Sequence, residues 1–268
     1  MLGSRLGAPV VHSIVTVTLP ETEAGEEQRR VTLDIWYRQS PSVQGLIIEA
    51  PIPIVFQLPG WVTPRNVNER LALLLANRGL LVIAADDIAW HEPYADPADE
   101  AARVARLEIG DKTSYEHTLK SGARRVQIGA RILARILDVL KSNPRLLELP
   151  NSITPDVHKI GIMGFSFGGA TAVGAASSDQ RITAVVNLDG WLFGEAAERP
   201  VPVPYLVFSS SQSIPTPAEL SSSRFEERAA AGLNLKEQSH QANQVRLRPD
   251  ALRFRIEGSD HADFTDSI

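Results

Sequence analysis

The sequence contains no cysteine. This excludes disulfide bonds, thiolate metal sites, iron–sulfur clusters and a cysteine nucleophile. The chain also lacks an excess of positive charge, since its formal net charge is -5 at pH 7, which argues against a nucleic-acid partner. No apolar run approaches the roughly 20 residues that span a bilayer, so we expect no transmembrane segment. Residues 1–11 lack the apolar stretch of a signal peptide, which favours a cytoplasmic location.

The chain has 268 residues, of which 43% are hydrophobic, enough for a large core. Residues 11–18 and 31–37 alternate apolar and polar side chains, as half-buried antiparallel strands do. From residue 52 onward, short apolar runs, typical of strands buried in a parallel sheet, alternate with segments of helical period. The apolar runs are residues 52–58, 80–85, 159–163, 182–188, 203–209 and 252–256, and the helical segments are 68–78, 114–141, 168–177 and about 219–232.

This order of elements predicts the α/β class, with a mixed, mostly parallel sheet, helices on both of its faces and an antiparallel hairpin at the N-terminus. No linker divides the chain, so we expect a single domain over residues 1–268.

A glycine-rich turn follows the strand at 159–163, with Ser166 at the centre of the G-x-S-x-G pattern from Gly164 to Gly168. A helix rich in small residues comes next. A sharp strand-to-helix turn of this kind presents a strained serine at the carboxyl edge of the sheet, where α/β proteins bind ligands. Glycine before and after the serine avoids clashes between the strand and the helix. Ser166 is therefore the predicted nucleophile.

A serine hydroxyl needs a base and a group that orients the base, and in such folds the chain order is serine, acid, histidine. His261 follows the last predicted strand, so it reaches the same sheet edge as Ser166 and is the predicted base. His240 also follows the serine, but it lies in a polar stretch typical of a solvated helix or loop.

The acid commonly follows the strand at 203–209, but the loop there contains no carboxylate. Asp189 ends the preceding strand, so we predict that it orients the imidazole. Glu219 is the second choice.

Negative charge that develops on a substrate carbonyl oxygen needs preorganised N–H donors. We expect these to be the backbone N–H groups of Phe167, after the nucleophile, and of Trp61, in the loop after the strand at 52–58. Pro59 in that loop has no N–H to offer.

Several aromatic side chains fall near predicted strand ends, where they could wall an acyl pocket. They are Trp61, Phe165, Phe167, Trp90 and Trp191. In residues 84–99, a cluster of acidic residues and a histidine (Asp86, Asp87, His91 and Glu92) matches no common metal-ligand spacing, which favours a rim loop or lid over a metal site.

Three segments resemble the α/β-hydrolase superfamily, and within it the platelet-activating-factor acetylhydrolases and dienelactone-hydrolase-like esterases. They are GFSFGG at 164–169, LDGWLF at 188–193 and GSDH at 258–261. The second is the most specific, since it resembles the acetylhydrolase segment in which the triad aspartate precedes a small residue and a tryptophan. The chain departs from the family in having Pro59 where a histidine is usual.

The resemblance implies a serine carboxylester hydrolase that uses Ser166, His261 and Asp189, with no metal or organic cofactor. It implies short acyl groups such as acetyl, on a lipid or a lactone, so the expected partner is a small-molecule ester. Two alternatives remain: an acyltransferase with the same triad, and a non-catalytic binding protein that keeps the fold.

Overall fold

The computed structural model describes residues 9–21, 27–39, 51–61, 63–86 and 111–266. Eight strands form one sheet in the order β1-β2-β4-β3-β5-β6-β7-β8. The strands are β1 (Val10–Leu19), β2 (Arg29–Arg38), β3 (Ile52–Leu58), β4 (Leu81–Ala85), β5 (Pro155–Phe165), β6 (Ile182–Leu188), β7 (Tyr205–Ser210) and β8 (Ala251–Ile256). β1 pairs antiparallel with β2, and β2 with β4, whereas all the other neighbours are parallel.

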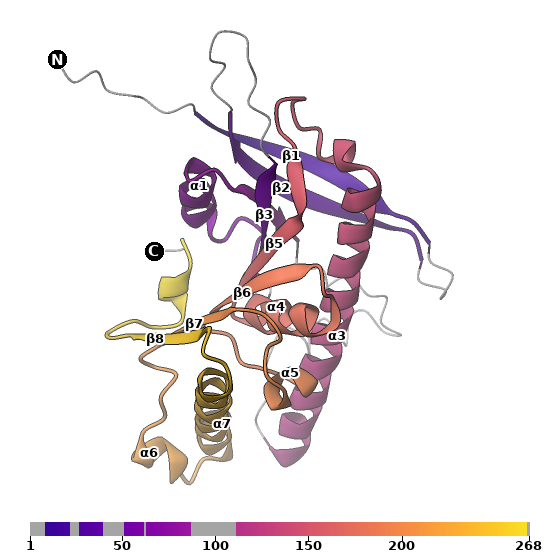
Figure 1. Cartoon of the computed structure of the whole chain (residues 1–268). Coiled ribbons are helices and arrows are strands. Elements are labelled where there is room, and N and C mark those ends of the chain that lie inside the picture. The colour runs from indigo at the N-terminus through magenta and orange to yellow at the C-terminus, as the bar shows by residue number, and fades with distance from the viewer. Residues whose placement is uncertain (1–8, 22–26, 40–50, 62, 87–110, 267–268) are drawn as a thin grey trace, which may run out of the picture.

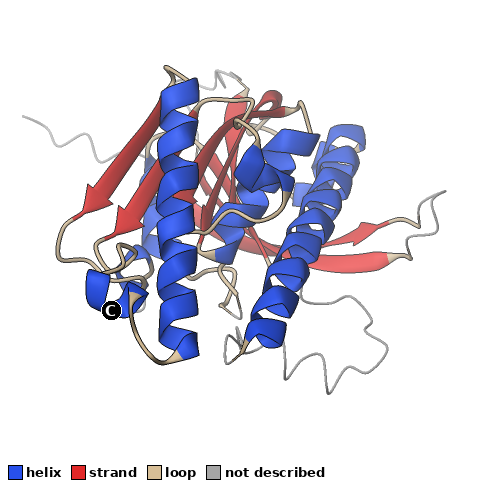
Figure 2. Cartoon of the chain, turned by 90° about the horizontal axis from the view of Figure 1, so that it is seen from below, coloured by secondary structure: helices blue, strands red, loops and turns tan. Residues whose placement is uncertain are grey.

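Helices connect the strands and cover the sheet (Figure 1). They are α1 (Glu69–Asn77), α3 (Lys112–Ser142), α4 (Phe167–Ser178), α5 (Glu195–Glu198), α6 (Pro217–Leu220) and α7 (Phe225–Leu247), with short 3-10 turns η1 (Pro144–Leu147) and η2 (Ala262–Phe264). Figure 2 shows the long helices α3 and α7 in front of the strands. Helix α1 packs on the opposite face, against buried residues of β2 and β4. The predicted fold class, with helices on both faces and the N-terminal hairpin, is confirmed.

The main core lies between the sheet and the long helix α3. The apolar stripe of α3, which includes Ile128, Leu133 and Ile136, is buried against β1, β2 and β3. Because these apolar residues recur at the 3.6-residue period of a helix, their burial explains why α3 forms one long helix. No helix within the described residues is both long and apolar enough to cross a membrane.

The helical pattern in the sequence predicted a single helix at about 219–232, where the structure has parts of two helices. The structure has the short α6, then a break, and then α7, which continues to Leu247. Helix α7 therefore runs through the polar stretch around His240, and Glu237, Gln241 and Gln244 on it are buried. Polar side chains at this helical spacing pack inward because backbone and side-chain partners satisfy them.

Candidate active site

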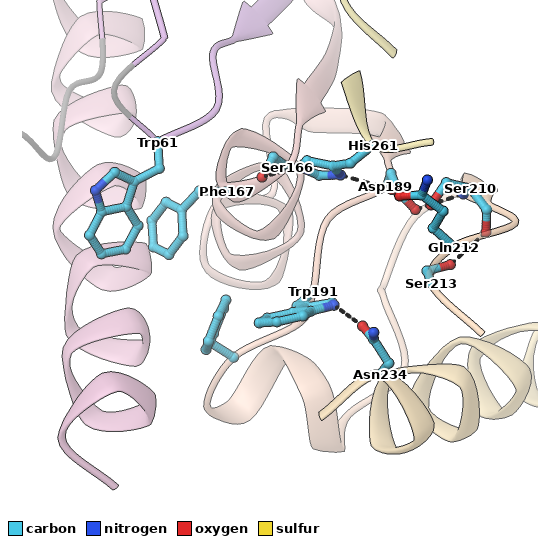
Figure 3. Close-up of a pocket in the computed structure, with 11 residues that line it drawn as sticks. Trp61, Ser166, Phe167, Asp189, Trp191, Ser210, Gln212, Ser213, Asn234 and His261 are labelled. Atoms are coloured by element: carbon cyan, nitrogen blue, oxygen red, sulfur yellow. Dashed lines mark hydrogen bonds and ion pairs between the residues drawn. The ribbon is translucent and has the colours of Figure 1, made fainter. Parts of the chain in front are cut away.

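Three side chains from distant parts of the chain meet at the carboxyl edge of the sheet (Figure 3). Oγ of Ser166 lies 2.9 Å from Nε2 of His261. Nδ1 of the same imidazole lies 2.8 Å from Oδ2 of Asp189. The hydroxyl, the imidazole and the carboxylate thus form one chain of hydrogen bonds, in the order that nucleophilic catalysis by serine requires.

Ser166 stands on a strained turn between β5 and α4. Its φ of 52° and ψ of -119° lie outside the regions that a non-glycine residue ordinarily adopts. A Cβ at Gly164 would overlap the backbone of Gly168, and a Cβ at Gly168 would overlap the carbonyl oxygens of Leu58 and Pro59. The glycines therefore allow the strand, the helix and the loop after β3 to close around the serine.

Asp189 directly follows β6, the strand next to β5. Its side chain is only 5% exposed. Oδ1 accepts a hydrogen bond of 2.8 Å from the backbone N–H of Ser210, while Oδ2 faces His261. Both carboxylate oxygens are thus held, so the carboxylate is fixed in the orientation that binds the imidazole.

Asn187 fixes the turn that carries Asp189. This fully buried side chain accepts a hydrogen bond from the N–H of Gly190 at 2.8 Å and donates one to its carbonyl oxygen at 2.9 Å. Its amide also donates to the hydroxyl of Tyr205 at 3.1 Å, and that hydroxyl donates to Gln241 of α7. Burial raises the pKa of Tyr205, so the hydroxyl remains a neutral link. We did not expect this role from the sequence, where the signal was an asparagine inside a buried apolar strand.

His261 is half exposed, with 50% of its side chain open to solvent. Its ring lies against Phe165, with 4.7 Å between ring centroids. Phe165 is buried with Met163 and Leu188, beneath the imidazole. The structure therefore places Phe165 under the base, where it supports the ring, and outside the lining of the cavity that opens at Ser166.

The segment after His261 is tied to the start of α1. The N–H of Asp266 donates to the carbonyl oxygen of Val67 at 2.9 Å. The carboxylate of Asp266 accepts a bond of 2.6 Å from the N–H of Arg70. These contacts anchor the histidine loop to the segment that begins α1.

A cavity of about 320 Å³ opens beside Ser166 and His261. One wall is aromatic and consists of Trp61, Phe167, Trp191 and Phe193. The other wall is polar and uncharged and consists of Ser210, Gln212, Ser213 and Asn234. Nε1 of Trp191 donates to Oδ1 of Asn234 at 2.9 Å, which joins the two walls (Figure 3).

Phe167 and Trp61, the residues expected to supply the N–H donors, line the same cavity as Ser166. Phe167 is the first residue of α4, where backbone N–H groups have no partner within the helix. Trp61 lines the same cavity, and its loop packs closely on the serine, since a Cβ at Gly60 would lie 3.2 Å from that of Ser166. The guanidinium of Arg125, a buried residue that we did not single out in the sequence, lies 4.1 Å from the centre of the Trp61 ring. This cation–π contact stabilises the position of the indole.

The other candidates lie elsewhere. Glu219 caps α6 through Thr216. His240 lies on α7 and lines a second cavity. Asp86 pairs with Arg65 at 2.9 Å. Trp90, and with it Asp87, His91 and Glu92, lies outside the described residues. The described part of the chain holds no cluster of three or more residues of the types that bind metals.

This sheet, with its strained serine turn and the arrangement of Ser166, His261 and Asp189, is that of an α/β-hydrolase. Residues 49–266 match the family model described as platelet-activating factor acetylhydrolase, isoform II. The chain belongs to this family, and the resemblance noted in the sequence is confirmed.

Relatives of known name agree with this assignment. The platelet-activating factor acetylhydrolase of Bos taurus is 28% identical over 189 residues, which cover 63% of this chain and 42% of the relative. That of Cavia porcellus is 36% identical over 173 residues, covering 59% and 40% of the two chains. The chain thus aligns with about two fifths of the length of these relatives.

The fold is also found in a solved structure, a ferulic acid esterase from Streptomyces cinnamoneus. The two superimpose with a TM-score of 0.59 over 96% of this chain and 76% of the esterase. Their sequences are 21% identical, so the likeness concerns the fold.

Proposed function

We propose that this chain is a carboxylester hydrolase in which Ser166 is the nucleophile, His261 the base and Asp189 the acid. The observation that carries the proposal is the continuous chain of hydrogen bonds from Oγ of Ser166 through the imidazole to Asp189, with distances of 2.9 and 2.8 Å. Membership of an acetylhydrolase family supports the same reaction.

In the first half of the reaction, Oγ of Ser166 attacks the carbonyl carbon of the ester while Nε2 of His261 takes the hydroxyl proton. The resulting imidazolium is stabilised by Asp189, whose buried carboxylate already faces Nδ1. The imidazolium then gives its proton to the departing alcohol, which leaves an acyl group on the serine.

In the second half, His261 takes a proton from water, and the hydroxide so formed attacks the acyl carbonyl. The tetrahedral intermediate collapses, the carboxylic acid leaves and Ser166 regains its proton. The half-exposed position of the imidazole gives water access to it. In both halves the backbone N–H groups of Phe167 and Trp61 are the donors that stabilise the oxyanion.

The cavity suits a short acyl ester. Its volume of about 320 Å³ is near the lower end of the range for small-molecule sites. The aromatic wall offers apolar contact to the acyl group, and the polar wall offers uncharged hydrogen-bonding partners to the alcohol. The names of the relatives point to acetyl as the acyl group.

Two measurements test the proposal. Purified protein is incubated with 4-nitrophenyl acetate, and separately with a fluorophosphonate probe followed by mass spectrometry of the labelled peptide. We expect turnover, labelling at Ser166, and a loss of up to about 10⁶-fold in kcat for Ser166→Ala. Neither turnover nor labelling in the folded wild-type protein would favour a non-catalytic binding protein. Transfer to an added alcohol in preference to water would favour an acyltransferase.

A further inference from the structure

A second cavity, of about 300 Å³, lies next to the cavity at Ser166, which is called the catalytic cavity below. The second cavity is formed between α3, α5 and α7. Trp191 and Phe193 line both cavities, so these two aromatic side chains form the partition between them.

The far side of the partition suits an alkyl chain. Four apolar residues from the three helices line the second cavity there: Leu119, Ala123, Ala197 and Leu233. Of its charged residues, Lys120, Glu198 and Lys236 are exposed, whereas the carboxylate of Glu237 is buried and accepts a hydrogen bond from the N–H of Leu192. The second cavity therefore combines these four apolar residues with charged groups, and an alkyl chain reaching it from the catalytic side would pack against the apolar residues.

Hydrogen bonds hold Trp191 in place on three sides. The residue before it, Gly190, is bound through its N–H and its carbonyl oxygen by Asn187. The residue after it donates its N–H to the buried carboxylate of Glu237 at 2.8 Å. The indole itself donates to Asn234. The partition at Trp191 is thus preorganised.

Phe193 is held by packing. It is only 7% exposed and belongs to an apolar cluster with Val126 and Phe167. A Cβ at Gly122 of α3 would lie 2.7 Å from its ring, so the ring fills the space against that helix. Trp191 is only partly buried, which makes it the member of the partition whose removal disturbs the core least.

We propose that Trp191 sets the upper limit on acyl-chain length by closing the catalytic cavity against the second one. The proposal rests on the hydrolase function proposed above and adds a determinant of specificity to it. Removal of the indole joins the two cavities, and the acyl chain of a longer ester then extends past the position of residue 191 toward Leu233 and Ala197.

The test compares kcat/KM for 4-nitrophenyl octanoate with that for 4-nitrophenyl acetate. In the wild type we expect acetate to be preferred. In Trp191→Ala the octanoate-to-acetate ratio should rise by at least about tenfold, because each buried methylene group contributes roughly fourfold in affinity. Trp191→Leu, which retains apolar contact with the cluster, provides a second variant with a smaller rise in the same direction.

Two controls isolate the partition. Trp61→Ala removes an indole from the same catalytic cavity, but from a wall that the second cavity does not share. Its ratio should change by less than about fourfold, the contribution of one methylene group, because the space that this indole leaves does not lead into the second cavity. Adding Ala197→Phe to Trp191→Ala fills the second cavity from α5 and should abolish the gain for octanoate.

A binding measurement separates this proposal from the catalytic one. Calorimetry with sodium octanoate should give a dissociation constant at least about tenfold lower for Trp191→Ala than for the wild type. If the wild type hydrolyses no ester and this difference is nevertheless found, the partition stands and the hydrolase proposal fails. A folded Trp191→Ala or Trp191→Leu variant with unchanged octanoate binding and an unchanged ester ratio would overturn the partition.

Discussion

Ser166 and Asp189 share an unusual backbone conformation, with φ values of 52° and 54°. Each directly follows one of two neighbouring parallel strands, and the N–H of Ser166 donates to the carbonyl oxygen of Leu188 at 2.8 Å. Non-glycine residues with positive φ cost about 1–3 kcal/mol each and persist only where the surroundings enforce them. The two strained residues are thus held side by side.

Asp189 is expected to be essential for the rate. Asp189→Asn should lower kcat for 4-nitrophenyl acetate by about 10⁴-fold, because the amide favours the wrong tautomer of the imidazole. Steady-state kinetics with matched thermal denaturation checks this. Glu219→Gln is the control, since that residue caps α6 through Thr216, and it should retain full activity. The opposite pattern would show that the acid has been misassigned.

Gly190 is expected to tolerate no side chain. A Cβ there would overlap the carbonyl oxygen of Ser166 and lie 2.7 Å from Oδ1 of Asn187. Gly190→Ala should therefore lower the free energy of unfolding by at least about 3 kcal/mol, measured by urea denaturation. Gly232→Ala in α7, where an added Cβ meets nothing within 4 Å, should instead stabilise the protein by about 0.5–1 kcal/mol. Equal effects in the two variants would contradict the packing of the acid turn against the nucleophile.

Asn187 is expected to act as a positioning residue. Asn187→Ala leaves the N–H and the carbonyl oxygen of Gly190 without their side-chain partner, at about 1–3 kcal/mol for each buried group. It should also lower kcat by about 10²-fold, the effect of a displacement of about an ångström in a catalytic group.

Tyr205→Phe is the matched control for Asn187. It removes the hydroxyl that joins Asn187 to Gln241 but leaves both hydrogen bonds to Gly190. Stability should fall by about 1–2 kcal/mol, and kcat should stay within about threefold of the wild type, well inside the effect of misplacing a catalytic group. If both variants lose kcat equally, the network acts through general stability alone.

The sequence predicted much of the fold, and it singled out three residues, Ser166, Asp189 and His261, whose side chains the structure brings together. Continuous apolar runs located the strands, with 52–58 and 182–188 matching β3 and β6 to the residue. Strand ends then placed Ser166, Asp189 and His261 near one edge, because carboxyl ends of parallel strands meet there. The contacts among these three side chains depend on loop conformations, which hydropathy does not encode.

What could not be predicted is mostly polar and buried. Glu237, Gln241 and Gln244 follow one face of α7 at helical spacing, yet they appeared to belong to a solvated stretch. Hydropathy cannot distinguish a polar side chain that faces water from one that faces a buried partner. Phe165 shows the complementary limit, since its aromatic character fitted a pocket wall equally well, and it supports His261 from beneath.

The pair of Asp179 and Arg181 gives a prediction for acid stability. Hydrogen bonds from Arg181, at 2.6 and 2.9 Å, hold the pKa of Asp179 below its usual value, against the opposing effect of burial. A carboxylate with a lowered folded-state pKa contributes stability that is fully present above the unfolded pKa of about 3.9 and is lost as the pH falls through the folded value.

Asp179→Asn should accordingly destabilise the protein by about 1 kcal/mol at pH 7. The difference from the wild type should disappear as the pH falls below about 3.9, as followed by urea denaturation across the acid range. Asp138→Asn removes the more exposed partner of Arg181 and should have a smaller effect at pH 7. A difference that grew toward low pH would have the wrong sign for this pair.

The hydrogen bonds of Asp266 with Val67 and Arg70 make the position of the imidazole depend on the start of α1, 196 residues earlier than Asp266 in the sequence. The hydrogen bond between Asp266 and the N–H of Arg70 is exposed, and such bonds open at lower free energy than a buried sheet does. In mild denaturant the protein should therefore lose esterase activity before the sheet unfolds, so that inactivation and unfolding are two separate transitions.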